Sequence, residues 1–262
     1  MSWLRLMEER IKRQQHHPAK KSGETAHKKH NRVTELLLEM WPAYLIEVLV
    51  IIIGIWITFA VEQWRDNSKE AELERVYQKN LLADINADQQ SLKYSIDNTR
   101  VILTNGNELL NFIKQPNTDP LSPAKADSDL QNILARPKFI TSDATFSDLK
   151  NSGNLRLLKD IRLKNLLFSY YSMAQNIKEA QNAEQEATVV ITGPYFFKHF
   201  AMGNIGNHGI NEQQLKSLST DAEFGNNLLL RIHNRNELLN GYKKADSLAV
   251  EVKKALEEQI KD

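Results

Sequence analysis

Residues Trp41–Trp64 read WPAYLIEVLVIIIGIWITFAVEQW and form the most apolar window of the chain. Within it, Val48–Val61 is 14 residues without a charge, and extension back to Ala43 gives 19 residues with one charge, Glu47. A helix needs about 20 mostly apolar residues to cross a hydrocarbon core about 30 Å thick. A buried core helix or strand would contain a similar run of Val and Ile. We predict a single transmembrane helix over residues 43–64.

Aromatic side chains stand at both ends of this segment. Trp41 and Tyr44 lie at one end and Trp64 at the other, and such residues prefer the level of the lipid headgroups. Pro42 falls in the first turn, where its missing N–H costs no hydrogen bond. We therefore expect Trp41, Tyr44 and Trp64 to act as interfacial anchors.

Glu47 has the most distinctive chemistry in the segment. A carboxylate inside a spanning helix is costly and by default indicates a functional site. Three interpretations are open: the carboxylate reaches the headgroup region, it pairs with a cation on a partner helix, or it couples ion movement as in stator-type complexes. Gly54 and Thr58 form a small-xxx-small pair that would let two helices approach closely.

The tail before the segment is basic. Residues 1–42 carry nine Lys or Arg and five acidic residues, whereas the count within 15 residues of the segment is equal on the two sides. A short basic tail is harder to export than a long domain of mixed charge, so we expect a cytoplasmic tail and an extracytoplasmic domain over 65–262. The apolar residues between Trp3 and Ile11 would suit an amphipathic helix on anionic lipid headgroups; a solvated tail is the alternative.

The rest of the chain has helical patterning. Apolar residues recur at three-, four- and seven-residue steps from Leu73 to Ile113, which predicts a long helix over 67–114 with a turn-prone Asn105-Gly106 pair. Similar steps predict a helix from a cap at Asp160 to about residue 190, and a last helix over 221–260.

Shorter helical signals lie between these long helices. They predict a helix over 129–135 and another that begins with a capping box at Thr145–Asp148. We predict an all-α protein in which one transmembrane helix precedes an elongated antiparallel helical bundle.

Two blocks of the sequence carry a family resemblance. One is EVLVIIIGIWITFAVEQWRDN (Glu47–Asn67), and the other is ATFSDLKNSGNLRLLKDIRLKNLLFSYY (Ala144–Tyr171). In this order they resemble a family of uncharacterised single-span proteins found mainly in Bacteroidota. The resemblance covers the span and about half of the remaining domain, and it departs at Val61–Trp64, where the family is richer in amides, and in the long basic tail. It implies a bacterial inner-membrane anchor with a helical periplasmic domain, and no known reaction, cofactor or catalytic residue.

Composition excludes several classes of protein. The 262 residues include 34 Lys or Arg, 33 Asp or Glu and no Cys. The balanced charge argues against a nucleic-acid partner, and the lack of Cys excludes disulfides, thiolate zinc sites and a Cys nucleophile. Ser152-Gly153 lacks the strand and flanking glycines of a nucleophile elbow, and GNIGNHG (Gly203–Gly209) lacks the context of a phosphate loop.

Histidines and aromatic residues offer weaker candidates. His27 and His30 have a spacing that could share a metal on a helix, but a solvated tail explains them as well, and we predict no metal site. Tyr170-Tyr171 and Tyr195–Phe197 could line a ligand pocket between helices, with core packing as the alternative.

The sequence supports a non-enzymatic function best. No set of nucleophile, base and oxyanion donors can be assembled from its spacings, and we expect no cofactor. We predict a membrane-anchored helical module that acts as an adaptor, scaffold or sensor through a protein partner or a homo-oligomer. The alternative is the single-span subunit of an ion-driven complex that uses Glu47.

Overall fold

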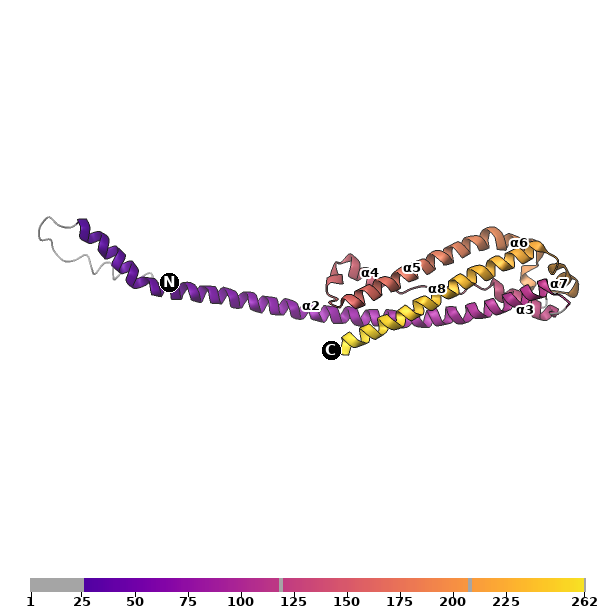
Figure 1. Cartoon of the computed structure of the whole chain (residues 1–262), viewed down its shortest axis with the longest axis horizontal. Coiled ribbons are helices and arrows are strands. Elements are labelled where there is room, and N and C mark those ends of the chain that lie inside the picture. The colour runs from indigo at the N-terminus through magenta and orange to yellow at the C-terminus, as the bar shows by residue number, and fades with distance from the viewer. Residues whose placement is uncertain (1–25, 118–119, 207–208, 262) are drawn as a thin grey trace. The chain divides into compact units, whose positions relative to one another are not determined.

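The computed structural model describes residues 26–117, 120–206 and 209–261, with side chains from residue 41 onwards except Ala43. The described residues are helical without a strand, so the all-α prediction is confirmed. The long helices are α2 (Ala26–Lys114), α5 (Ile161–Ala187) and α8 (Ala222–Lys261); the shorter ones are α3 (Pro123–Leu134), α4 (Ala144–Asn151), α6 (Gly193–His199) and α7 (Glu212–Leu218), with single turns η1 (Asn154–Arg156), η2 (Thr188–Thr192) and η3 (Met202–Asn204) (Figure 1).

The chain forms two compact units, residues 1–66 and 67–262, and α2 contributes residues to both. The first unit contains the apolar segment of α2, which in the described part of the chain is the one helical stretch long and apolar enough to cross a membrane. None of its apolar window is buried. Within the described residues no protein core covers this segment, so it is not a buried core helix. The predicted amphipathic helix between Trp3 and Ile11 lies outside the described residues.

The second unit has a core of its own. Within the described residues, its buried apolar side chains run from Tyr77 to Leu256 and form two clusters. Both clusters consist of residues beyond residue 66, so we expect this unit to fold without residues 1–66. On α2 the buried face follows the predicted helical steps at Leu81, Ile85 and Leu92, whereas Leu73, which the same steps predicted to face inward, is 39% exposed.

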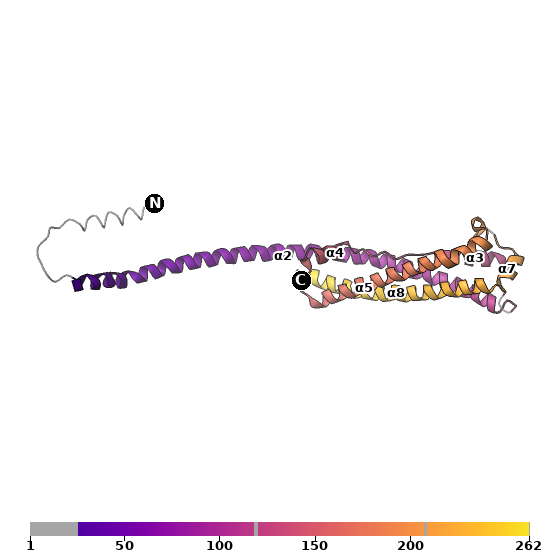
Figure 2. The same ribbon diagram turned by 90° about the horizontal axis from the view of Figure 1, so that it is seen from above.

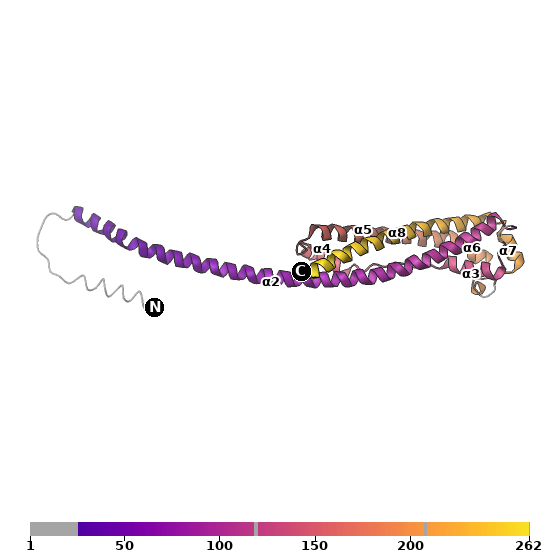
Figure 3. The ribbon, with the colours of Figure 1, turned by 60° about the horizontal axis from the view of Figure 1, so that its bottom comes forward.

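Contacts within the second unit set the directions of its long helices. Gln259 Nε2 donates to Asp160 Oδ2 at 3.4 Å, so the end of α8 lies at the beginning of α5. Arg235 Nε lies 2.8 Å from Glu184 Oε1, so the first half of α8 lies at the end of α5. The two helices lie side by side in both further views (Figures 2 and 3).

Residues 135–143 connect the two ends of this unit without helical structure. Ala135 O accepts from Arg235 Nη2 at 3.1 Å near the end of α5, whereas Ser142 N donates to Asp88 Oδ1 at 2.8 Å. Pro137 is incompatible with a continuing helix, which explains why α3 ends at Leu134. We refer to residues 135–143 as the connecting segment.

The turn-prone Asn105-Gly106 pair does not interrupt the helix, which continues to Lys114. A Cβ added at Gly106 would lie 3.0 Å from Ile232 Cγ1, so the glycine serves close packing of α2 against α8 rather than a turn. The capping box predicted at Thr145–Asp148 is absent, since α4 begins at Ala144 behind Asp143.

Other helix boundaries agree with the sequence signals to different degrees. Asp160 caps α5 as predicted, with its Oδ1 accepting from Arg162 N at 2.7 Å. In contrast, the helix predicted over 129–135 begins at Pro123, behind a cap at Ser122. Proline is favoured at the first helical position, where its missing N–H costs no hydrogen bond, and this explains the start at Pro123.

Candidate functional site

The sequence candidates in the apolar segment are exposed on α2. Glu47 is exposed, and it has no cationic partner within ion-pair distance in the described part of the chain. Its three interpretations therefore remain predictions. Trp41, Tyr44 and Trp64 are 54%, 51% and 74% exposed, and their role as interfacial anchors stays a prediction.

The small-residue pair in this segment is open to a neighbour. Thr58 Oγ1 donates to Gly54 O at 2.9 Å, which satisfies the hydroxyl within its own helix. A Cβ added at Gly54 would meet no atom within 4 Å. The predicted helix–helix contact at Gly54 and Thr58 stays a prediction, because one chain cannot form it alone.

A groove in the second unit is the better-formed candidate. It has a volume of about 700 Å³ and lies between α4, α5 and the connecting segment. We call it the α4–α5 groove. Its lining combines three lysines, four aromatic rings and several hydroxyl and amide groups; these residues are Lys138, Phe139, Ile140, Thr141, Asp143, Phe146, Ser147, Lys150, Phe168, Tyr171, Ser172, Ala174, Gln175, Lys178, Gln181 and Asn182.

Asp88 of α2 fixes one end of the connecting segment. Its carboxylate is 1% exposed and accepts from Thr141 Oγ1 at 2.8 Å, from Ser142 N at 2.8 Å and from Tyr170 Oη at 2.6 Å. Three donors offset much of the cost of burying the charge. Burial, together with the hydrogen bond to Asp88, raises the pKa of Tyr170 well above its ordinary value.

Gln181 of α5 holds the middle of the segment. Its side chain accepts from Phe139 N at 2.9 Å and donates to Phe139 O at 3.0 Å. This two-way pairing satisfies the buried backbone groups of Phe139 much as a neighbouring strand would. Tyr242 Oη also donates to Gln181 Oε1, at 3.3 Å.

A buried cationic cluster fixes the other end. Arg231 and Arg235 of α8 are 3% and 0% exposed, and both donate to Ala135 O, at 3.2 and 3.1 Å. Glu184 is the carboxylate between them, 2.8 Å from Arg235 Nε and 3.7 Å from Arg231 Nη1. Burial, together with the Arg235 charge, lowers the pKa of Arg231 to about 10. The cluster and the Asp88 and Gln181 contacts make the connecting segment a fixed wall of the groove.

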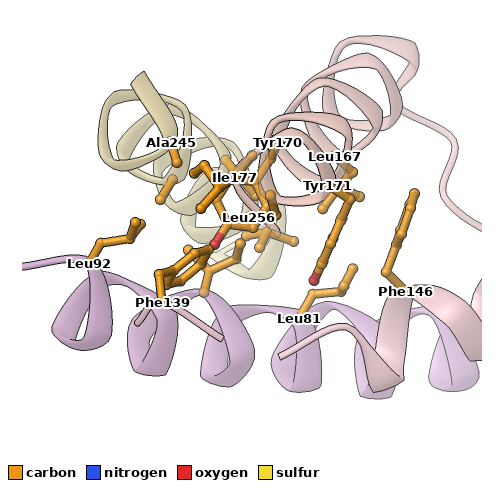
Figure 4. Close-up of a cluster of buried hydrophobic side chains, with 14 of the residues drawn as sticks. Leu81, Leu92, Phe139, Phe146, Leu167, Tyr170, Tyr171, Ile177, Ala245 and Leu256 are labelled. Carbon is orange, nitrogen blue, oxygen red and sulfur yellow. The ribbon is translucent and has the colours of Figure 1, made fainter. Parts of the chain in front are cut away.

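Aromatic rings line the groove at its α4 end, and Figure 4 shows two of them, Phe146 and Tyr171, side by side. Phe146 and Tyr171 stack with centroids 4.3 Å apart and an interplanar angle of 5°. Phe168 meets the edge of Phe146 at 5.3 Å. Phe146 and Tyr171 are buried, whereas Phe168 is 43% exposed and is the ring of the three that an occupant would meet.

Three lysines line the groove, one of them beside these rings. Lys150 Nζ lies 5.6 Å from the centroid of Phe146, within reach of a cation–π attraction. Lys138 and Lys178 line the part of the groove next to Gln181. In the described part of the chain none of the three lysines has a carboxylate within ion-pair distance, and Asp143 is the one acidic residue that lines the groove.

The other sequence candidates lie in different surroundings. Tyr171 lines the groove, whereas Tyr170 is fully buried against Asp88, and Tyr195 and Phe196 pack in the second core cluster. Phe197 is 75% exposed. Among the described residues, no three His, Asp or Glu side chains lie close enough to hold a metal ion.

Sequence analysis missed the groove because its residues are far apart in the chain. Lys138, Lys150 and Lys178 belong to three different parts of the fold. Lys138 and Lys178 stand in no motif, and nothing in the Ala144–Tyr171 block marked Lys150 as a site residue. The weak signal was Pro137, which ends helical structure just before the connecting segment. Comparison of the chain with protein-family models, with curated proteins and with solved structures finds no match.

Proposed function

We propose that the chain is a single-pass, non-enzymatic membrane protein whose helical domain acts as an adaptor, scaffold or sensor in a membrane protein complex. One observation carries the proposal: the uncovered apolar segment of α2 adjoins, in sequence, a unit that buries its own core. An apolar surface that no protein covers and that is about as long as a bilayer is thick needs lipid around it.

The orientation belongs to the same proposal. The nine basic residues of 1–42 favour a cytoplasmic tail, which would place residues 67–262 in the periplasm of a bacterial cell. The resemblance of Glu47–Asn67 and Ala144–Tyr171 to single-span Bacteroidota proteins supports an inner-membrane location. Contact of the basic tail with anionic headgroups is part of this proposal.

The periplasmic domain would be an elongated bundle in which α8 runs antiparallel to α5. The Gln259–Asp160 and Arg235–Glu184 contacts, one at each end of α5, support this arrangement. Its long lateral surfaces suit contact with another protein, or with a second copy of the chain.

Crosslinking and mild extraction from native membranes test the adaptor function. The tagged full chain is expected to recover a stoichiometric partner, or a ladder of its own oligomers. The 67–262 unit, exported behind a cleavable signal peptide, serves as the matched sample. Retention by this unit would assign the contact to the domain, and loss would assign it to the span. Recovery of a monomeric chain alone would contradict the proposal.

A subunit of an ion-driven complex is the second candidate. The exposed carboxylate of Glu47 in an apolar segment, without a cationic partner in the described residues, favours it. Glu47→Gln would then abolish ion-driven activity while expression and assembly persist. Glu62→Gln is the matched control, because Glu62 is also exposed and lies at the other end of the segment. Unchanged ion-driven activity of both variants would eliminate this candidate.

A further inference from the structure

The α4–α5 groove is long enough for an extended chain. Its lining on α5 runs from Phe168 to Asn182, which is 14 residue steps, or about 21 Å at 1.5 Å per residue. An extended peptide advances about 3.3 Å per residue, so about six residues would fill that length.

The charges of the groove are spread along this length. Lys150 lies at the aromatic end, over Phe146, whereas Lys178 is seven residues beyond Tyr171 on α5, a rise of about 10 Å. One small anion would meet only one of these lysines. A chain with several acidic side chains would meet both.

The positive charge is a local feature of this surface. Residues 67–262 contain 24 Lys or Arg and 25 Asp or Glu, so the unit as a whole does not attract anions. The groove has three lysines against Asp143 alone. Ile140, which is 78% exposed, and the half-exposed Phe168 add apolar surface that an occupant would cover.

We propose that the α4–α5 groove binds an extended segment of a partner protein, about six residues long. An apolar side chain of this segment packs on the exposed ring of Phe168, and its acidic side chains lie near Lys150 at one end and near Lys138 and Lys178 at the other. The binding mode rests on the adaptor function proposed above and names the chemistry of the partner. The fixed connecting segment supplies a preformed wall, so little ordering accompanies binding.

Selection from a random octapeptide phage library on the purified 67–262 unit tests the groove directly. Enriched peptides are expected to combine at least two acidic residues with an aliphatic or aromatic one. Synthetic copies, measured by fluorescence anisotropy, are expected to bind Lys138→Glu/Lys178→Glu at least about tenfold more weakly. Lys93→Glu/Lys243→Glu is the control, because both residues are exposed on other helices and the charge change is equal.

Several results would overturn the inference. These are the absence of any enriched peptide, enrichment of basic peptides, and equal weakening by the groove and control variants. Binding to phosphatidylglycerol vesicles that depends on Lys138 and Lys178, without peptide binding, would assign the groove to lipid instead. Urea unfolding of each variant separates lost binding from lost folding.

The full chain in native membranes distinguishes the two proposals. If the Lys138→Glu/Lys178→Glu chain recovers the same partner as the unsubstituted chain, the groove inference fails and the adaptor function stands. If the unsubstituted chain recovers no partner, the adaptor function fails, whatever peptides the isolated unit binds.

Discussion

Two regions of the same helix, α2, differ in the exposure of their apolar residues. Between Leu45 and Val61 the apolar side chains surround the helix, and the bulky ones are about half exposed or more. Between Leu81 and Leu109 they recur on one face, and that face is buried in the second unit. A helix that is apolar all round needs an apolar surrounding, whereas a striped helix needs only a neighbour along its stripe. This difference is the one that the proposed span predicts, with lipid around one region and protein around the other.

The largest effect is expected from charges in the apolar segment. Ile52→Lys/Ile55→Lys should prevent stable insertion, because each lysine near the centre of a span costs about 3 kcal/mol. Ala87→Lys/Gln90→Lys has the same spacing at exposed positions of α2 in the second unit and should leave insertion intact. Extraction of membranes with alkaline carbonate measures the difference. Continued retention of the Ile52/Ile55 variant would argue that the segment is not a span.

A smaller effect, a partial loss of stability, is expected from a substitution in the core of the second unit. Leu92→Ala should lower the free energy of unfolding by about 3 kcal/mol, since Leu92 is fully buried and truncation leaves a cavity. Val101→Ala, at a position 49% exposed on the same helix, should change it by less than about 0.5 kcal/mol. Urea unfolding of the 67–262 unit gives both values. Equal effects would mean that the face of α2 is wrongly assigned.

The hydrogen bonds of Asp88 should contribute somewhat less than Leu92 to the free energy of unfolding. Asp88→Asn places an amide N–H₂ among the groups that now donate to the carboxylate, and we expect a loss of about 2 kcal/mol. Asp97→Asn is the control: Asp97 is exposed, and its 3.1 Å pair with Arg100 should be worth less than about 1 kcal/mol. Protection of the connecting segment from proteolysis should fall in the first variant alone. Unchanged protection would refute its role as a fixed wall.

Alkaline pH should destabilise the second unit and leave the apolar segment unaffected. Burial raises the pKa of Tyr170 and raises that of Tyr242 to about 12, so the folded unit keeps protons that the unfolded chain loses near pH 10. Stability should fall as pH rises through 10, because each tyrosine with a raised pKa lowers it by about 0.7 kcal/mol per pH unit at pH 10. Four such tyrosines outweigh the opposite effect of the lowered pKa of Arg231 and Arg235; they are Tyr170, Tyr171, Tyr195 and Tyr242. Unfolding at several pH values, with tyrosinate absorbance as a second signal, checks this. Stability that rises above pH 10 would contradict the burial.

The long helices could be predicted because their signals are local. The apolar run around Val48–Val61 and the steps along Leu81, Ile85 and Leu92 are readable from neighbouring residues alone. The packing role of Gly106 in the turn-prone Asn105-Gly106 pair could not be predicted, because it depends on Ile232, more than a hundred residues later. Tertiary contact there overrides the local turn preference.

The candidate site shows the same limit more strongly. Glu47 was visible because a charge in an apolar run is conspicuous in sequence. Asp88 and Gln181 were not, because each is an ordinary polar residue on a helix until Ser142 and Phe139 are brought to it. Non-local pairing of side chain with backbone leaves no trace in the spacing of either partner.

The most direct test of the membrane assignment uses the absence of cysteine from the chain. Single cysteines at Ser22, Ile53 and Ser247 are exposed to a membrane-impermeant maleimide in spheroplasts of a bacterial host. We predict labelling of Ser247→Cys in intact spheroplasts, of Ser22→Cys only after lysis, and of Ile53→Cys only after the membrane is dissolved in detergent. Labelling of Ile53→Cys as readily as Ser247→Cys would contradict the span, and exchange of the two terminal patterns would contradict the orientation.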